Sequence, residues 1–590
     1  MIQKLRMGTI ALALCAAPHV YAQHNEDDQN GIRRVLLLSI DGMHALDYLN
    51  CMEGQPNYCP NLTALGKTGV NYTRTSTSRP SDSFPGLMAL VTGGTPRLVG
   101  AFYDVAYDRV LAPPWHDTGN GVFGGTCKPN TPNGTTTEYE EGVEIDQTLL
   151  NGGNPNAKDV TDGGVDGIDK TRLPRDPYKA DSTNGGCAPV YPWNFIRANT
   201  IYGVIHAAHG FTAWSDKHSV YAAVSGPTGT DKPSNVDDYY SPEVNSNVIA
   251  LPGVTTADGM ACAVGNPATP PDNNNKTWTD SFQNIRCYDQ LKVNAVVNWI
   301  NGKTHLGKPG APVPTIFGMN FQAVSVGQKL IEGGVKGGYT DAKGTPTMNM
   351  KEEIVFVDAA IGQMVSALTK LGMLDSTLII VTAKHGQSPI DTHRFQEVGK
   401  GITTTPADVL ASNYLPPPPA PENPNTANGI GPTQDDISLL WLKPGANVED
   451  AVNLLEASGT AGIGLGQIFY DESLETLYNA PGLPNPGPCC QTNGGDPRTP
   501  DIIVQPNVGV VYTSSTKKQS EHGGFAHDDT NVMLLVSNPG LDASTVTAFV
   551  ETTQVAPTIL QALGLDPTRL DAVKKEGTPV LPGLAFKQHD

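Results

Sequence analysis

Short apolar runs and amphipathic stretches alternate through much of the chain. Residues 35–40 form a nearly continuous apolar run that ends at Asp41, a pattern typical of a strand buried on both faces. Residues 315–321 and 378–382 are similar runs, whereas residues 352–371 carry apolar side chains at helical spacing. The alternation predicts an α/β fold with a mostly parallel sheet and helices on both of its faces. Further strands are expected at 70–77, 212–214, 437–442, 501–505 and 532–536, and further helices at 59–69, 85–91, 194–210 and 555–563.

Three stretches interrupt this alternation and are predicted to be large loop insertions, at about residues 113–195, 225–300 and 400–495. The third contains the Pro-rich segment LPPPPAPENP. The whole chain has 63 Gly and 48 Pro, which favours long loops around one compact core over several helical domains. Residues 23–590 are therefore expected to form a single α/β domain with insertions.

The N-terminus has the features of an export signal. Lys4 and Arg6 precede a short apolar stretch, and residues 20–22 have the small-x-small pattern of a cleavage site. Residues 1–22 are therefore predicted to be a signal peptide, and the mature protein to be secreted or periplasmic. No later stretch is long enough for a membrane span. The formal net charge of −20 argues against binding to a nucleic-acid duplex.

Eight cysteines remain after the predicted signal peptide is removed, and an even number in an exported chain favours disulfides. None has the CxxC spacing of a zinc site. Pairing between neighbours along the chain predicts Cys51–Cys59, Cys127–Cys187 and Cys262–Cys287, with Cys489 and Cys490 left over.

Four residues are candidates for chemistry, and each has a structural alternative. Asp41 follows a predicted central strand, where ligands of open α/β sheets bind, although an Asp before Gly also caps turns. Ser83 precedes a predicted helix, where it is either an anion-binding nucleophile or an N-cap. His385 and His522 each stand beside Gly, as metal ligands or as hydrogen-bonded loop residues.

These stretches share their order and sequence with a known family. They are IDG at Asp41, SDSFPGLMALVTGGTP at Ser83, VTAKHG at His385 and EHGGF at His522. Together with CPNLTALGKTGV and TTQVAPTILQALGL, they resemble the type I phosphodiesterase/nucleotide pyrophosphatase family of the alkaline phosphatase superfamily. The resemblance spans most of residues 33–110 and 310–565.

The resemblance implies an alkaline-phosphatase-like core, a nucleophilic Ser or Thr, two divalent metals that are usually zinc, and a covalent phospho-enzyme intermediate. Carried over by position, Ser83 is the nucleophile. Asp41, Ser83 and His385 belong to one metal site, and His522 belongs to the other. The substrate-binding candidates lie around the nucleophile and in the stretch after its helix; they are Phe84, Gly86, Tyr103 and Asp104.

Several positions depart from the family pattern. Lys384 stands where the family has an Asp, and Gly86 where it has an Asn. Asn320 and Val324 stand where it has an Asp and a His, so only Asn320 keeps a ligating oxygen. These changes lead us to expect one divalent metal ion, zinc in most members, rather than two. Lys384 is predicted to be catalytic, as a fixed ammonium beside Ser83 that replaces part of the lost positive charge.

The function predicted from these features is an exported hydrolase of phosphoric ester or phosphoanhydride bonds, acting on a small organic phosphate in the manner of a phosphodiesterase or nucleotide pyrophosphatase. One alternative is a non-catalytic binding protein that keeps the fold with a degenerate metal centre. Another is a sulfatase or phosphonate hydrolase of the same superfamily, although SDSFPG lacks the CxPxR context of a sulfatase.

Overall fold

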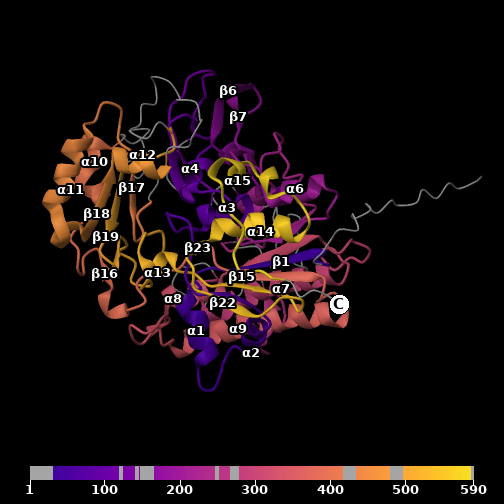
Figure 1. Cartoon of the computed structure of the whole chain (residues 1–590). Helices are drawn as coiled ribbons and strands as arrows, with labels where there is room; N and C mark the ends of the chain where they lie inside the picture. Colours follow the sequence, from indigo (N-terminus) through magenta and orange to yellow (C-terminus); the bar gives the residue numbers. More distant parts are fainter. Residues whose placement is uncertain are drawn as a thin grey trace, which may run out of the picture.

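An eight-stranded sheet forms the centre of the protein (Figure 1). The computed structural model describes residues 31–585 apart from 119–121, 123, 140–144, 147–164, 246–250, 263, 266–277, 416–432 and 479–495. The predicted signal peptide, Cys489 and Cys490 therefore lie outside the described residues. In spatial order the strands are β22 (Ser544–Val546), β2 (Gly69–Tyr72), β21 (Leu534–Ser537), β15 (Thr377–Thr382), β1 (Arg34–Ile40), β12 (Ile316–Phe321), β8 (Ala213–Ser215) and β9 (Asp238–Tyr240).

Most neighbours in this sheet run parallel, which confirms the predicted sheet. Strand β1 is parallel to both β15 and β12, and β12, β8 and β9 continue in the same direction, whereas β21 is antiparallel to β15 and β2. Ser39 is paired with Asn320 on one side and with Thr382 on the other. The chain segments that follow β1, β12 and β15 therefore leave the sheet at one edge, where ligands of such sheets bind.

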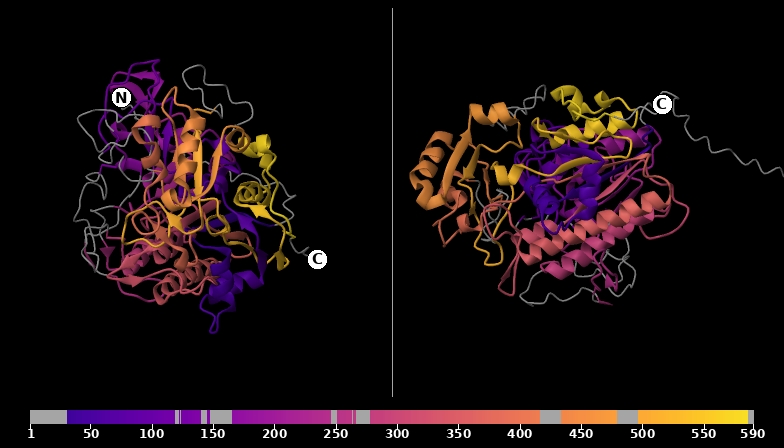
Figure 2. Two further views of the ribbon diagram at one scale, coloured as in Figure 1. Left: turned by 90° about the vertical axis from the view of Figure 1, so that its left-hand side faces the viewer. Right: turned by 60° about the horizontal axis from the view of Figure 1, so that its bottom comes forward.

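Helices cover both faces of the sheet (Figure 2). Val35 and Leu37 of β1 face a core that includes side chains of α3 (Ser83–Thr92), α6 (Ile201–Ala207) and α14 (Val555–Ala562). Leu36 and Leu38 face the opposite core, with side chains of α2 (Pro60–Lys67), α7 (Phe282–Ile300) and α9 (Met348–Lys370). The prediction of a loop insertion is therefore wrong for α7, which packs against α9 and β12. The predicted helix 194–210 is also two helices, α5 (Pro192–Phe195) and α6, because the Thr200 side chain caps a new start.

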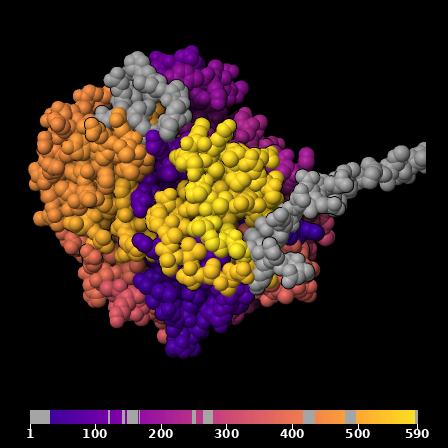
Figure 3. All heavy atoms as spheres, viewed as in Figure 1, coloured from indigo at the N-terminus to yellow at the C-terminus, as the bar shows by residue number. Residues whose placement is uncertain are grey.

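Much of the region predicted as the third insertion is a second α/β layer rather than loop. It contains α10 (Pro406–Tyr414), β17 (Ser438–Leu440), α11 (Val448–Ile463), β18 (Leu465–Tyr470), α12 (Glu472–Tyr478) and β19 (Ile502–Pro506). The order β17-β19-β18 is antiparallel throughout, and the lobe has its own core around Trp441. The strands predicted at 437–442 and 501–505 thus exist, but in this lobe. Figure 3 shows it in orange, beside the C-terminal segment in yellow.

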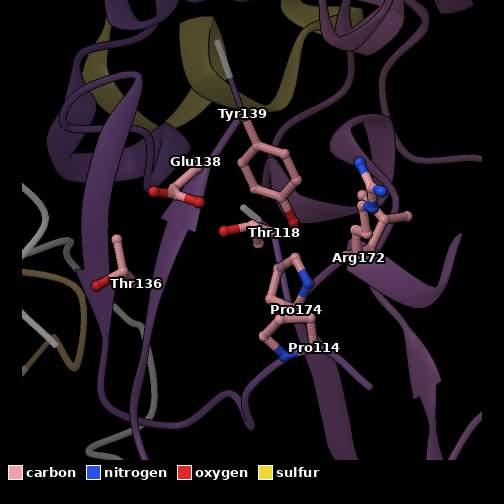
Figure 4. Close-up of a pocket in the computed structure, with 8 residues that line it drawn as sticks. Pro114, Thr118, Thr136, Glu138, Tyr139, Arg172 and Pro174 are labelled. Atoms are coloured by element: carbon pink, nitrogen blue, oxygen red, sulfur yellow. The ribbon is translucent and has the colours of Figure 1, made fainter. Parts of the chain in front are cut away.

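The region predicted as the first insertion also contains regular structure. Strand β5 (Thr135–Glu138) pairs with β4 (Val105–Asp108), and β6 (Arg175–Asp181) forms a hairpin with β7 (Gly186–Pro189). Figure 4 shows a cavity here, of about 10 Å³, lined by residues that include Thr118, Tyr139 and Pro174. A space of this size holds at most a single water, so it is no substrate site.

Short ladders and helices complete the described chain. The ladders pair β3 (Thr75–Ser76) with β23 (Val550–Glu551), β10 (Leu251–Pro252) with β11 (Val264–Gly265), β13 (Ile331–Glu332) with β14 (Val335–Lys336) and β16 (Gln396–Glu397) with β20 (Val510–Val511). The remaining α-helices are α1 (Ala45–Glu53), α4 (Pro96–Val99), α8 (Ala323–Lys329), α13 (His527–Thr530) and α15 (Asp571–Glu576), and several short 3-10 helices lie between the other elements.

All three predicted disulfides, Cys51–Cys59, Cys127–Cys187 and Cys262–Cys287, are present. Among the residues described, no helix combines the length and the apolar character needed to cross a bilayer.

Candidate active site

Ser83 is the first residue of helix α3, but it does not cap that helix. The N-cap is Asp82, whose side chain accepts a hydrogen bond from the Phe84 backbone N–H at 3.1 Å. Gly93 ends the helix in the left-handed conformation, with φ of 73°. Because Asp82 performs the capping, the Ser83 hydroxyl is left for other contacts. The alternative in which Ser83 is the N-cap is therefore wrong.

The Ser83 hydroxyl lies among three side chains from three other parts of the fold. Its Oγ is 3.1 Å from His385 Nε2 and 3.3 Å from Asp41 Oδ2, and it accepts a hydrogen bond from Lys217 Nζ at 3.0 Å. The other ring nitrogen of His385, Nδ1, lies 2.8 Å from the Gly386 carbonyl oxygen, to which only a protonated nitrogen can donate. In the neutral ring Nε2 is therefore an acceptor, and the hydroxyl proton has two acceptors within reach, His385 Nε2 and Asp41 Oδ2.

Asp41 follows β1 and is fully buried. Its Oδ2 accepts hydrogen bonds from Asn320 Nδ2 at 3.1 Å and from Gln322 Nε2 at 2.6 Å, and lies 3.8 Å from Lys217 Nζ. Burial by itself raises the pKa of this carboxyl, but Lys384, His385 and Lys217 outweigh it and hold the pKa well below its usual value. Asp41 is therefore a carboxylate in the folded protein.

Lys384 follows β15, as predicted, but its ammonium pairs with a different partner. Nζ lies 2.9 and 3.1 Å from the two carboxylate oxygens of Asp216 and 4.0 Å from the centre of the Tyr221 ring. Asp216 also accepts a hydrogen bond from Trp214 Nε1 at 2.9 Å. The ammonium in contact with Ser83 thus belongs to Lys217 and not to Lys384, which corrects the expectation from the sequence.

On the other side of the site, the His522 ring lies next to His385 and Asp82. The His522 ring centre lies 4.0 Å from that of His385, and its Nδ1 lies 3.5 Å from Asp82 Oδ1. Burial lowers the pKa of His522 well below its usual value, and the ammonium groups of Lys329 and Lys217 lower it further, so the imidazole is neutral. Val324 lies in the apolar core on α8, so it adds no ligand to His522.

The substrate-binding candidates separate into two groups. Tyr103 donates a hydrogen bond to Asp435 Oδ2 at 2.8 Å and another to the His522 carbonyl at 3.2 Å. The backbone N–H of Asp104 donates to Asp82 Oδ2 at 2.9 Å. Burial raises the pKa of Asp82 well above its usual value, and the neighbouring Asp104 carboxyl raises it further. Tyr103 and Asp104 therefore lie next to the His522 side of the site.

Phe84 and Gly86 present no side chain to Ser83. Phe84 is buried in the core, where its ring contacts those of Tyr139, Phe195 and Tyr221. Gly86 faces the end of β15, and a Cβ atom there would lie 2.2 Å from the Lys384 carbonyl oxygen. Both residues set how α3 packs, and the structure brings neither side chain to the hydroxyl.

The Ser83 hydroxyl lies deep in the fold. Asp41, Ser83 and Lys384 are 0% exposed, whereas Lys217 and His522 are 6% and 7% exposed. Lys217 and His522 therefore have slightly more contact with solvent than Ser83.

Sequence comparison assigns the family. The family model for type I phosphodiesterase / nucleotide pyrophosphatase matches residues 35–134 and 325–529, together more than half of the chain. The chain belongs to the type I phosphodiesterase/nucleotide pyrophosphatase family. Both matched segments carry parts of the site, since the first includes Asp41 and Ser83 and the second includes His385 and His522.

Solved structures agree with this family at the level of the fold. Murine ectonucleotide pyrophosphatase/phosphodiesterase 5 is similar with a TM-score of 0.50 and 14% sequence identity, over 90% of this chain and 96% of that one. An inactive variant of the same mouse protein, in complex with AMP, gives a TM-score of 0.50 and 14% identity, over 91% and 96% of the two chains. Among curated proteins, none matches the chain by sequence.

Members of this type I phosphodiesterase family typically depend on divalent metals. Three candidate ligand atoms in this chain lie at distances that suit one metal ion. Asp41 Oδ2, Ser83 Oγ and His385 Nε2 are separated by 3.1, 3.3 and 3.7 Å. Such spacings suit three ligands of one tetrahedral zinc ion, whose bonds are about 2.0–2.2 Å long. Among the residues that the structure describes, however, no group of three or more His, Cys, Asp or Glu could hold a metal ion.

The charge at Ser83 does not fit a metal ion. An ion bonded to Ser83 Oγ at about 2 Å would lie within about 5 Å of the Lys217 ammonium, which is 3.0 Å from that oxygen. At that separation a dication and an ammonium repel by about 7 kcal/mol at an effective dielectric constant of about 20. That is about half of the free energy with which proteins hold structural zinc. The donor set therefore does not support the expected zinc ion while Lys217 is charged.

Sequence reasoning missed Lys217, Asp216 and Gln322. All three follow parallel strands of the main sheet, since Asp216 and Lys217 come directly after β8 and Gln322 directly after β12. The rule that drew attention to Asp41, a polar residue at the carboxyl end of a buried strand, applies to all three. Because the sequence predicts a strand at 212–214, the same rule could have identified the polar residues that follow it, Asp216 and Lys217.

Proposed function

We propose that this protein is an exported hydrolase of organic phosphates, with phosphodiesterase or nucleotide pyrophosphatase activity that uses Ser83 as its nucleophile. One observation carries the proposal: the buried Ser83 oxygen lies between an imidazole acceptor, His385 Nε2, and an ammonium donor, Lys217 Nζ. A hydroxyl with a base on one side and a cation on the other has the environment of an activated nucleophile.

The first step transfers a phosphoryl group to the protein. Ser83 Oγ attacks phosphorus, the Oγ–P bond forms, and the bond from phosphorus to the leaving oxygen breaks. The Oγ proton passes to His385 Nε2, and the departing alkoxide or phosphate takes a proton from solvent when its basicity requires one. Asp41, which is ionised, stabilises the positive charge on the His385 ring, since its Oδ2 lies 3.7 Å from Nε2.

The second step releases the product. A water attacks phosphorus from the side that the leaving group vacated, its O–P bond forms, and the P–Oγ bond breaks. Ser83 takes back the proton held by His385, and the water gives its surplus proton to solvent. One water is consumed for each phosphoester or anhydride bond cleaved, and the serine returns to its starting state.

The substrate class is a nucleotide-like organic phosphate. Support comes from the family and from the mouse structure whose title places AMP in an inactive variant of a related protein. Export is supported by the three disulfides and by the predicted signal peptide.

The test is hydrolysis of three nitrophenyl esters by the purified mature chain. We expect turnover of bis-p-nitrophenyl phosphate to exceed that of p-nitrophenyl phosphate, with no turnover of p-nitrophenyl sulfate. Ser83→Ala should reduce diester turnover at least about a thousandfold, because the nucleophile is lost. Ser81→Ala is the matched control, since Ser81 is equally buried near Ser83 but accepts a hydrogen bond from the Gly523 N–H. Equal turnover by the Ser83→Ala variant and the wild type would refute the role of Ser83.

The altered ligand positions favour a second candidate, a binding protein that does not catalyse hydrolysis. Val324 and Lys384 occupy positions where the family resemblance implies metal ligands. Under this candidate, calorimetry would detect AMP binding by the wild type while none of the three esters is hydrolysed.

A further inference from the structure

We infer that Lys217 is a catalytic residue, and that its ammonium acts on Ser83 in the place of the metal ion that other members of the family use. This inference rests on the proposed function, in which Ser83 is the nucleophile. It concerns a residue that lies outside both segments matched by the family model.

The position of Lys217 follows from the sheet. Strand β8 is parallel to β12 and ends at Ser215, so residues 216 and 217 emerge at the same edge as Asp41. The Lys217 backbone N–H donates to Asp216 Oδ1 at 2.8 Å, and the Lys217 carbonyl accepts from Val244 N–H at 3.0 Å. The backbone of Lys217 is thereby fixed on both sides, and its side chain reaches Ser83 Oγ and Asp41 Oδ2.

The contacts of the other buried lysine, Lys384, show why the ammonium next to Ser83 is that of Lys217. Asp216 receives both the Lys384 ammonium and the Trp214 indole N–H, so the charge of Lys384 is matched by a carboxylate 2.9 Å away. The centre of the Tyr221 ring lies 4.0 Å from Lys384 Nζ and 5.7 Å from Lys217 Nζ, so both ammonium groups lie near this ring. Lys384 and Asp216 are therefore positioning residues, and the ammonium aimed at the reacting oxygen is that of Lys217.

An ammonium in this position can perform two tasks of a metal ion. Its hydrogen bond to Ser83 Oγ stabilises the negative charge that develops as the hydroxyl proton moves to His385 Nε2. Because Nζ is 3.0 Å from Oγ, it is also within reach of a non-bridging oxygen on a phosphorus atom bonded to Oγ. No co-reactant beyond water and the phosphate ester is required.

Zinc binding tests the inference without any measurement of activity. Calorimetric titration of the wild type and of Lys217→Met with zinc should give an affinity at least about a thousandfold higher for the variant, because the opposing charge is gone. Lys217→Arg keeps the charge and should bind zinc as weakly as the wild type. Equal zinc affinities in the wild type and Lys217→Met would overturn the inference.

Turnover provides the second arm. Wild-type protein treated with a chelator should keep its diester hydrolysis, whereas Lys217→Met should lose about a thousandfold in kcat and recover part of it in added ethylammonium. Lys329→Met is the matched control: its ammonium lies 3.8 Å from Glu521, and it should keep kcat within about threefold. Loss of wild-type turnover on chelation, with recovery on addition of one equivalent of zinc, would overturn the inference.

The two arms separate this inference from the proposed function. If the wild type hydrolyses no phosphate ester with or without zinc, the proposed function fails, and with it the catalytic role of Lys217. The zinc titration then still decides whether Lys217 excludes a metal ion. If the wild type is active only with zinc, the proposed function stands and the inference about Lys217 is wrong.

Discussion

The two sides of the candidate site differ in the charge of their side chains. On the side built by β1, α3 and β15, the Ser83 hydroxyl has three polar neighbours, and the Asp41 carboxylate accepts from two amides through Oδ2. On the other side the His522 imidazole is neutral. Among the described residues, each side has a buried polar atom without a hydrogen bond, Asp41 Oδ1 on the first and His522 Nδ1 on the second. One side is therefore charged, and the other is a neutral lining.

This difference allows a test of where the positive charge at the site comes from. The family resemblance implies metal ligands on both sides, whereas Asn320, Val324 and Lys384 stand at three of those positions. Two ammonium groups lie on the Ser83 side: Lys384 pairs with Asp216, and Lys217 Nζ lies 3.0 Å from Ser83 Oγ and 3.8 Å from Asp41 Oδ2. If this charge supports the proposed chemistry, substitutions on the Ser83 side should lower activity more than substitutions on the His522 side.

The largest effect should come from His385. His385→Gln removes the acceptor of the Ser83 proton, and we expect kcat for bis-p-nitrophenyl phosphate to fall by about 10²–10⁴. Near-ultraviolet circular dichroism would establish that the tertiary packing is retained. If kcat falls by less than threefold, the proton goes elsewhere and the two sides are not functionally distinct.

Replacing Lys384 should lower the stability of the fold. Lys384→Met leaves the Asp216 carboxylate buried without its ammonium, which should lower the free energy of unfolding by about 3–5 kcal/mol. Urea denaturation measures this change. Adding Asp216→Asn should recover part of the loss, because the unpaired charge is removed. A destabilisation equal to that of an exposed lysine variant such as Lys308→Met would contradict the ion pair.

His522 should matter less than His385. Its ring is neutral and 7% exposed, and one hydrogen bond to the substrate is worth about tenfold in rate. His522→Gln is therefore expected to raise KM or lower kcat by about tenfold in steady-state assays. A loss as large as that of His385→Gln would show that the His522 side takes part in the chemistry.

The smallest effect is a pH dependence. Burial lowers the pKa of Lys217 to about 8, with Lys384 and Lys329 lowering it further while Asp41 and Asp82 oppose the shift. The ammonium is present below that pKa and lost above it, so kcat/KM should fall about fourfold between pH 7 and pH 8.5. Lys217→Arg, which stays charged, should remove this decline. An unchanged profile in that variant would assign the decline to another group.

Local patterns in the sequence were sufficient to predict the first side of the site. The apolar run before Asp41, the Pro85-containing helix start after Ser83 and the apolar run before His385 are short and self-contained signals, and each element is present. The family resemblance supplied the roles that these signals alone left open.

The elements and site residues that the sequence did not predict depend on contacts between distant segments. Helix α7 was missed because it buries charged residues as ion pairs, such as Lys292 with Asp289 at 2.9 Å, which hide its apolar pattern. Lys217 was missed because β8 is only three residues long and the loop after it has no motif. The choice of Lys384 as the ammonium at Ser83 was wrong because sequence could not show that Asp216 would pair with it.

Helix α3 packs closely against the segment after β15 at Gly86, where a Cβ atom would lie 2.2 Å from the Lys384 carbonyl oxygen. A side chain at position 86 would force apart the segments that carry Ser83 and His385. The distance between the Ser83 hydroxyl and the His385 imidazole is therefore set in part at a position that has no side chain.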